Sequence, residues 1–267
     1  MLRGGQVRDL TYVHLRTEDR IAVLTVDHPP VNALDEATFR DLEAAFRAAQ
    51  EDEMVKVIVI TGTGRSFVAG ADIGSLAEMT TPVEAEELAR SGQDLMLRIE
   101  RSPKPVIAAI NGRFCLGGGN ELAMACHIRI AEERTKFAQP EITLGLIPGW
   151  GGSRRLAHLV GLGKAVELIL TGNHIRAHEA QQLGLVNRVV AEGTALEEAM
   201  RLARQLVALS SEGLRLALDC IYGELDMGAE EAMAYEARRF AEMACTYDKC
   251  EGVSAFLQKR RPQFEDR

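Results

Sequence analysis

The sequence has few cysteines, and their arrangement excludes two ways of stabilising a small fold. The 267 residues include five cysteines, an odd number, with no CxxC pair. Secreted disulfide frameworks use even numbers of cysteines, and structural zinc sites use closely spaced Cys and His pairs. We therefore expect a reducing, cytoplasmic setting and no metal site. Since 46% of the residues are hydrophobic, a chain of this length can bury a core without either aid.

Long apolar runs and an excess of positive charge are also missing. No uncharged apolar stretch reaches the roughly 20 residues that span a membrane, and the N-terminus has no apolar core followed by a cleavage site. The net charge is −8 and the pI is near 5.4, so the chain has no general attraction to nucleic acid or anionic lipid. We expect a soluble, unprocessed protein with no nucleic-acid or membrane partner.

Several well-known catalytic motifs are incomplete. Ser153 in "GGSRR" lacks the second glycine of a GxSxG elbow, and "GLGKA" lacks most of a phosphate loop. "GTGRSF" and "GGGNEL" each miss the third glycine of a dinucleotide fingerprint. His174 and His178 are four residues apart, but the Glu of an HExxH zinc motif is absent. The motifs therefore support neither a hydrolase, nor a nucleotidase, nor a metalloenzyme.

Strand and helix patterns alternate over the first two thirds of the chain. Two β-branched runs around residues 17–20 predict a hairpin, and "DEATFRDLEAAFRAAQED" then predicts a helix before the strand "VKVIVITG". A helix over residues 82–101, the strand "KPVIAAING", a glycine-led helix and a hairpin in "IRIAEERTKFA" follow. This order predicts an α/β domain with ligand contacts at strand ends and helix N-termini. From about Ala195 onward the pattern is helical only, which indicates an appendage that covers a core or an oligomer contact.

Glycine-dense turns stand at two of the predicted strand ends. The turns that end at Gly70 and Gly119 would leave backbone N–H groups pointing at open space near a helix start. Preorganised N–H groups of this kind form oxyanion holes. The alternative is that the glycines only make tight turns, and the sequence leaves both interpretations open.

Two carboxylates follow these turns. Glu121 lies three residues past Gly118, and Glu141 lies twenty residues further on, just beyond the predicted hairpin. If that hairpin folds back toward the glycine-led helix, both carboxyl groups face one pocket, where one can be protonated and the other anionic. That arrangement suits paired acid and base chemistry. The alternative for each glutamate is an ordinary solvated surface position.

Four motifs together resemble the enoyl-CoA hydratase (crotonase) family. They are "SFVAGADI", "AAINGRFCLGGGNELAMAC", "FAQPEITLGLIPGWGGSRRL" and "LTGNHIRAHEAQQLGLVNRVV", and the similarity extends from the first hairpin to "AFLQKRRPQF". The resemblance implies an α/β spiral of repeated ββα units over residues 1–195 and an all-helical trimerisation region over residues 196–267. It also implies a homotrimer or a homohexamer built as a dimer of trimers.

The resemblance also implies roles for individual residues. The backbone N–H groups of Ala71 and Gly118 would bind the thioester oxygen of an acyl-CoA substrate. Glu121, Glu141 and the N–H of Gly149 would hold one water, with Glu121 as the base toward that water and Glu141 as the proton donor to the α-carbon. No metal and no separate cofactor are implied, because coenzyme A is part of the substrate.

Further substrate contacts are implied at both ends of the chain. Ala71, Asp72, Ile73 and Gly74 would line the coenzyme A path, and residues 75–97 would shape the acyl pocket. The aromatic rings of Phe240 and Phe256 would close that pocket, and Lys259 would reach a coenzyme A phosphate from a neighbouring subunit. The sequence departs from the family pattern at Gly74, where a lysine is common, and at His127, where an aspartate is usual.

The resemblance favours one reaction and leaves two alternatives. Hydratases of the family carry glutamates at both motif positions, and this sequence has Glu121 and Glu141 there. The expected reaction is therefore reversible syn hydration of a trans-2-enoyl-CoA to the 3-hydroxyacyl-CoA, in fatty-acid β-oxidation or a related short-chain pathway. An isomerase or another acyl-CoA lyase would need only one of the glutamates. A non-catalytic RNA-binding relative would need a lysine-rich helix, which the acidic composition argues against.

Overall fold

A six-stranded sheet forms the centre of the protein. The structure is a computed structural model that describes residues 10–78 and 80–266; residues 1–9, at the start of the predicted 1–195 region, lie outside this description. The strand order is β1-β2-β3-β4-β6-β9, and all neighbours are parallel except β1 and β2. The strands are β1 (Val13–Glu18), β2 (Ile21–Val26), β3 (Val57–Gly62), β4 (Val106–Ile110), β6 (Ile128–Glu132) and β9 (Arg188–Val190). The predicted first hairpin, β1 with β2, is confirmed.

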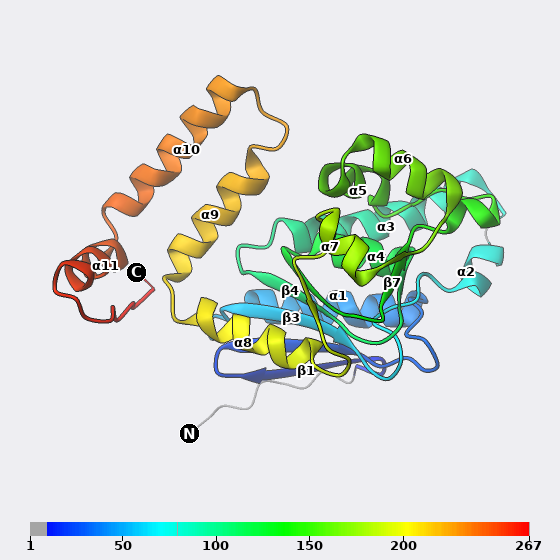
Figure 1. The fold of residues 1–267 in the computed structure, drawn as a ribbon, viewed down its shortest axis with the longest axis horizontal. Helices are drawn as coiled ribbons and strands as arrows, with labels where there is room; N and C mark the ends of the chain where they lie inside the picture. Colours follow the sequence, from blue (N-terminus) through cyan, green and yellow to red (C-terminus); the bar gives the residue numbers. More distant parts are fainter. Residues whose placement is uncertain (1–9, 79, 267) are drawn as a thin grey trace.

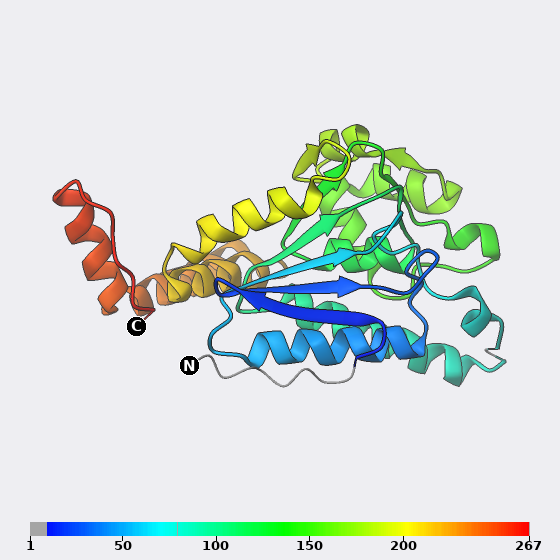
Figure 2. The same cartoon turned by 90° about the horizontal axis from the view of Figure 1, so that it is seen from below.

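Helices cover both faces of this sheet, and Figure 2 shows α1 and α8 on opposite sides of it. Helices α1 (Glu36–Glu51) and α3 (Pro82–Glu100) form the predicted crossovers from β2 to β3 and from β3 to β4. Helix α1 starts where the carboxylate of Asp35 accepts the backbone N–H of Thr38 at 2.8 Å. Its apolar stripe packs on one face, and α8 (Ala195–Val207) packs on the other.

A second, three-stranded sheet corrects one prediction. It consists of β5 (Phe114–Leu116), β7 (Lys136–Ala138) and β8 (Ile175–Arg176), in the order β5-β7-β8. The hairpin predicted for "IRIAEERTKFA" is therefore wrong, because β6 and β7 lie in different sheets. Both edges of β6 are already paired, with β4 and β9. The Thr135 hydroxyl donates to the carbonyl of Gly112 at 2.7 Å, which directs the chain toward β5 instead.

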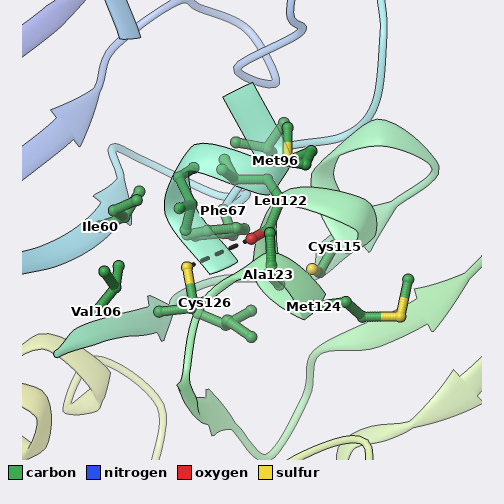
Figure 3. Close-up of a cluster of buried hydrophobic side chains, with 14 of the residues drawn as sticks. Ile60, Phe67, Met96, Val106, Cys115, Leu122, Ala123, Met124 and Cys126 are labelled. Carbon is green, nitrogen blue, oxygen red and sulfur yellow. Dashed lines mark hydrogen bonds between the residues drawn. The ribbon is translucent and has the colours of Figure 1, made fainter. Parts of the chain in front are cut away.

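Helix α4 (Gly118–Ala125) lies in the middle of the core. All eight of its residues are buried, and Figure 3 shows its side chains among apolar residues from the sheet and from α3. The thiol of Cys126 donates to the carbonyl of Leu122 at 3.3 Å, which closes the C-terminal end of the helix. Because this helix is buried on every side, its position is determined by packing, and its N-terminus is held rigidly.

Helices and short turns complete the fold around the sheets. They are α2 (Ile73–Glu78), a 3₁₀ helix (Glu141–Leu144), α5 (Gly152–Val160), α6 (Leu162–Thr171), α7 (Ala177–Gln182), α9 (Ser211–Gly223), α10 (Ala229–Ala244) and α11 (Tyr247–Leu257). Within the described residues, no helix is both long enough and apolar enough to cross a bilayer.

The C-terminal helices α9, α10 and α11 extend away from the sheet (Figure 1). The all-helical pattern predicted after Ala195 is confirmed over the described residues, while the boundary at that residue stays a prediction. The end of the chain returns to the core, because the Asp266 carboxylate pairs with Lys56 at 2.9 Å and with Arg20 at 2.7 Å. These ion pairs anchor the base of the extension to the sheet.

Candidate active site

A cavity of about 410 Å³ lies where the N-terminus of α4 meets the ends of several loops. Three segments and one helix form its walls: the chain after β3, the start of α4, the loop that precedes α5, and one side of α3. Six of the residues predicted for catalysis or substrate binding line it, namely Ala71, Ile73, Gly118, Glu121, Glu141 and Gly149. The structure therefore brings the two glutamates and both glycine-dense turns to one place.

Two backbone N–H groups at the cavity wall, those of Ala71 and Gly118, are not used by the backbone hydrogen bonds of the elements they belong to. Ala71 forms a parallel bridge with Leu34, whose bonds run from Leu34 N–H to Gly70 C=O and from Asp72 N–H to Leu34 C=O. Neither bond uses the Ala71 N–H, which in such a bridge points to the opposite side. The N–H of Gly118 belongs to the first turn of α4 and so has no acceptor inside the helix. Both groups suit an oxyanion.

The Glu121 side chain is buried and held by the loop that precedes α5. It is 2% exposed, and its Oε1 accepts the backbone N–H of Trp150 at 2.8 Å and that of Gly152 at 2.7 Å. Burial, with a smaller contribution from the charge of Glu141, raises the pKa of Glu121 to about 7, although the two N–H groups and Arg155 oppose the shift. A carboxyl with a pKa near neutrality can exchange a proton during a reaction.

Glu141 reaches the same cavity by a route other than the predicted hairpin. Strand β7 pairs with β5, and the N–H of Gly117 donates to the carbonyl of Ala138 at 3.0 Å, which places the following residues beside the start of α4. Burial raises the pKa of the Glu141 carboxyl. Its Oε2 is buried and, among the described residues, has no hydrogen-bond partner. Such an atom is available to a ligand or a water.

A buried ion pair supports the loop that holds Glu121. Arg155 pairs with Glu100, at the end of α3, and donates from Nη1 to the carbonyl of Trp150 at 2.9 Å. The Oε1 atom of Glu100 pairs with the more exposed Arg154 at 3.1 Å. None of Arg155, Glu100 and Trp150 was predicted as a site residue, although "GWGGSRRL" contains the one tryptophan of the chain.

The remaining predicted residues divide into two groups. Asp72 and Gly74 flank the cavity residue Ile73 where α2 begins, in line with a path into the cavity. Phe240, Phe256 and Lys259 lie on or just after α10 and α11, and the single chain does not bring them to the cavity. The two phenylalanines are 78% and 82% exposed. Their predicted role therefore requires another subunit.

His127, one of the two departures from the family pattern, has a structural environment. Its Nδ1 accepts the backbone N–H of Val106 at 2.9 Å, and its Nε2 lies 3.1 Å from the carbonyl of Glu100. Burial lowers the pKa of His127 to about 4, so the ring is neutral near pH 7. The ring joins the end of α3 to the start of β4 and does not line the cavity.

The fold and this site define an α/β protein with two N–H donors and two glutamates around one cavity. The sequence model described as enoyl-CoA hydratase/isomerase matches residues 16–267, and the chain belongs to this family. It is 43% identical to a probable enoyl-CoA hydratase of Bacillus subtilis (95% of this chain, 98% of that one) and 39% identical to a short-chain-enoyl-CoA hydratase of Clostridium acetobutylicum (95% and 97%).

Solved structures agree with the family assignment. An enoyl-CoA hydratase subunit from Geobacillus kaustophilus superimposes with a TM-score of 0.92 at 37% identity, over 97% of this chain and 100% of that one. The crotonase-like fold class, expected from the four motifs, is confirmed. In the described residues, no three His, Cys, Asp or Glu side chains gather as a metal site.

Proposed function

We propose that the protein is an enoyl-CoA hydratase that adds water reversibly, with syn geometry, to trans-2-enoyl-CoA thioesters. One observation carries this proposal: Glu121 and Glu141 both line the cavity that Ala71 and Gly118 also line. A single carboxyl would serve an isomerase, whereas hydration has to manage two protons, one leaving the water and one reaching the α-carbon. The names of the relatives support the same reaction.

The oxyanion donors would activate the substrate. The β-carbon of an enoyl thioester accepts water only when charge can move onto the carbonyl oxygen. In the proposed pose, the N–H groups of Ala71 and Gly118 donate hydrogen bonds to that oxygen. The positive end of the α4 dipole further stabilises its negative charge. Removing one such donor typically lowers turnover by about 10²- to 10³-fold. The fixed position of α4 in the core makes its donor preorganised.

The glutamates would handle the protons. Glu121, Glu141 and the N–H of Gly149 hold the water. The loop at Gly149 is itself held by α3, because the Gln93 side chain donates to the Gly149 carbonyl at 2.8 Å. Glu121 takes a proton as the water oxygen bonds to the β-carbon, and Glu141 donates its proton to the α-carbon as the enolate collapses. Transfers of this kind contribute about 10²- to 10⁴-fold. The pair ends with one proton, as it began.

The coenzyme A portion and the assembly complete the proposal. Ala71, Asp72, Ile73 and Gly74 line the entry path, and no separate cofactor is needed because coenzyme A is part of the substrate. Phe240, Phe256 and Lys259 act on a neighbouring subunit of a homotrimer or homohexamer, which the exposure of both rings supports. A cytoplasmic location belongs to the same proposal and is supported by the odd number of cysteines, all free thiols.

The direct test compares two reactions of the purified protein. Crotonyl-CoA hydration is followed by loss of the enoyl-thioester ultraviolet absorbance, and 3-hexenoyl-CoA isomerisation is followed by its appearance. We expect hydration to dominate. Isomerisation without hydration would overturn the assignment in favour of the alternative that uses one glutamate.

A further inference from the structure

The indole of Trp150 is seated between two helices that come unusually close to it. A Cβ placed on Gly92 of α3 would lie 2.1 Å from the Cδ1 of the indole, and a Cβ placed on Gly118 of α4 would lie 2.3 Å from its Cζ3. Both distances are far below van der Waals contact, so the ring occupies space that only glycine leaves free. We call this space, bounded by Gly92 and Gly118, the indole slot.

The ring in the indole slot cannot easily move aside. Only 6% of Trp150 is exposed, and the ring of Phe39 packs against it with centroids 5.5 Å apart. Its backbone is held on both sides, since its N–H donates to Glu121 and its carbonyl accepts from Arg155. Trp150 is therefore a rigid part of the wall.

Trp150 also lines the cavity, next to the groups that would surround the reacting atoms. The indole lies against Gly118, a proposed donor to the thioester oxygen, and the N–H of the same residue binds the proposed base Glu121. The cavity lining on α3 consists of Ala85, Leu88, Ala89 and Gln93, all smaller than tryptophan. Trp150 is the one aromatic ring in the cavity lining of the described chain. An acyl chain that continues from the reacting double bond along this wall would meet the indole.

We infer that Trp150 limits the length of the acyl chain and makes the enzyme selective for short enoyl thioesters. This inference rests on the proposed hydratase function. Truncating the ring opens the indole slot as an extension of the cavity, with the glycines at its sides unable to refill it. Longer acyl chains can then extend into the opened slot, whereas a four-carbon chain is too short to use it.

The first experiment measures kcat/KM for hydration of C4, C6, C8 and C10 trans-2-enoyl-CoA by the wild type, Trp150→Leu and Trp150→Ala. We expect the C8-to-C4 ratio of kcat/KM to rise by about 10-fold or more in Trp150→Ala, because single methylene groups in apolar pockets discriminate by 10-fold or more. Because the C8 value of each variant is divided by its own C4 value, a loss of turnover that is common to all chain lengths cancels. Phe39→Leu is the matched control: it loosens the packing behind the ring without changing the cavity lining, so its ratio should stay at the wild-type value.

An unchanged C8-to-C4 ratio in variants that still hydrate crotonyl-CoA would overturn the inference alone. Failure of the wild type to hydrate any chain length would instead defeat the proposed function. If Trp150→Ala does not fold, Trp150→Leu and Trp150→Phe give the graded series.

A second measurement uses the wild type and needs no catalysis. Trp150 is the one tryptophan of the chain, so its fluorescence reports on the indole slot. Titration with butyryl-CoA and octanoyl-CoA should change the emission more than titration with coenzyme A alone, because the acyl chain meets the ring. Equal responses to all three would show that the chain runs elsewhere and would overturn the inference.

Discussion

The backbone N–H of Trp150 lies 2.8 Å from Oε1 of Glu121 and positions this proposed catalytic base. The same residue also forms part of the cavity wall. The side chain of that residue occupies the indole slot, and its carbonyl is held by Arg155. The position of the base and the shape of the acyl pocket therefore depend on the same short loop. Changes in this loop should affect both properties together.

Replacing either glutamate by glutamine should abolish most hydration. Glu121→Gln and Glu141→Gln keep the size of the side chain and remove its proton chemistry, so we expect each to lower kcat for crotonyl-CoA by at least ~10²-fold. Glu133→Gln, at an exposed position, is the matched control and should hydrate normally. Near wild-type hydration by a folded Glu121→Gln or Glu141→Gln protein would contradict the role of that residue.

Glu121→Gln should also change how stability depends on pH. Burial raises the pKa of Glu121 from its ordinary value of 4.5 to about 7. Between these values the folded protein keeps a proton that the unfolded chain has lost, so the free energy of unfolding falls as pH rises through this window, by up to about 3 kcal/mol. Glutamine does not titrate, so the variant does not lose stability in this window, and its amide oxygen can still accept hydrogen bonds from the N–H groups of Trp150 and Gly152. It should therefore be the more stable protein at pH 8.

Thermal unfolding at pH 5 and at pH 8 measures this difference. We expect the melting temperature of the wild type to fall relative to that of Glu121→Gln between the two values. A constant offset at both pH values would show that Glu121 does not titrate in this range.

Gly118→Ala should act through the indole and not only through the substrate. The added Cβ would meet Cζ3 of Trp150 at 2.3 Å, so the ring or the helix has to shift, which typically costs about 1–3 kcal/mol of stability. In a Trp150→Leu background the same substitution should cost much less. Denaturant unfolding of the two single variants and the double variant measures this coupling. If the losses of stability in the two single variants simply add up in the double variant, the alanine at position 118 does not press against the indole in solution.

The exposed rings on α10 and α11 should be needed for assembly. Phe240→Glu and Phe256→Glu place a charge on rings that are 78% and 82% exposed in the single chain. If these rings pack against another subunit, burying the charge is unfavourable and sedimentation should show smaller species. Met54→Glu, at a position 67% exposed on the turn after α1, is the control and should leave assembly intact. Sedimentation of the wild type as an active monomer would contradict the proposed assembly.

Local structure was largely determined by the sequence. The apolar spacing of α1, the capping carboxylate of Asp35 and the β-branched runs of β1 and β2 act between residues close in the chain, and the structure confirms these elements. The four motifs likewise indicated the family and named the residues Ala71, Gly118, Glu121 and Glu141, which line one cavity.

Pairing between distant segments was decided only by the tertiary structure. Strand β6 pairs with β9, with Ile130 opposite Arg188, and leaves no edge for β7, so the local pattern of a hairpin was misleading. The indole slot depends on Gly92, Gly118 and Trp150, which belong to three separate segments. Sequence spacing carries no record of such a contact, because the distance between two helices is set by the whole core that packs around them. For the same reason, only the folded chain shows that Phe240 and Phe256 are exposed and available to another subunit.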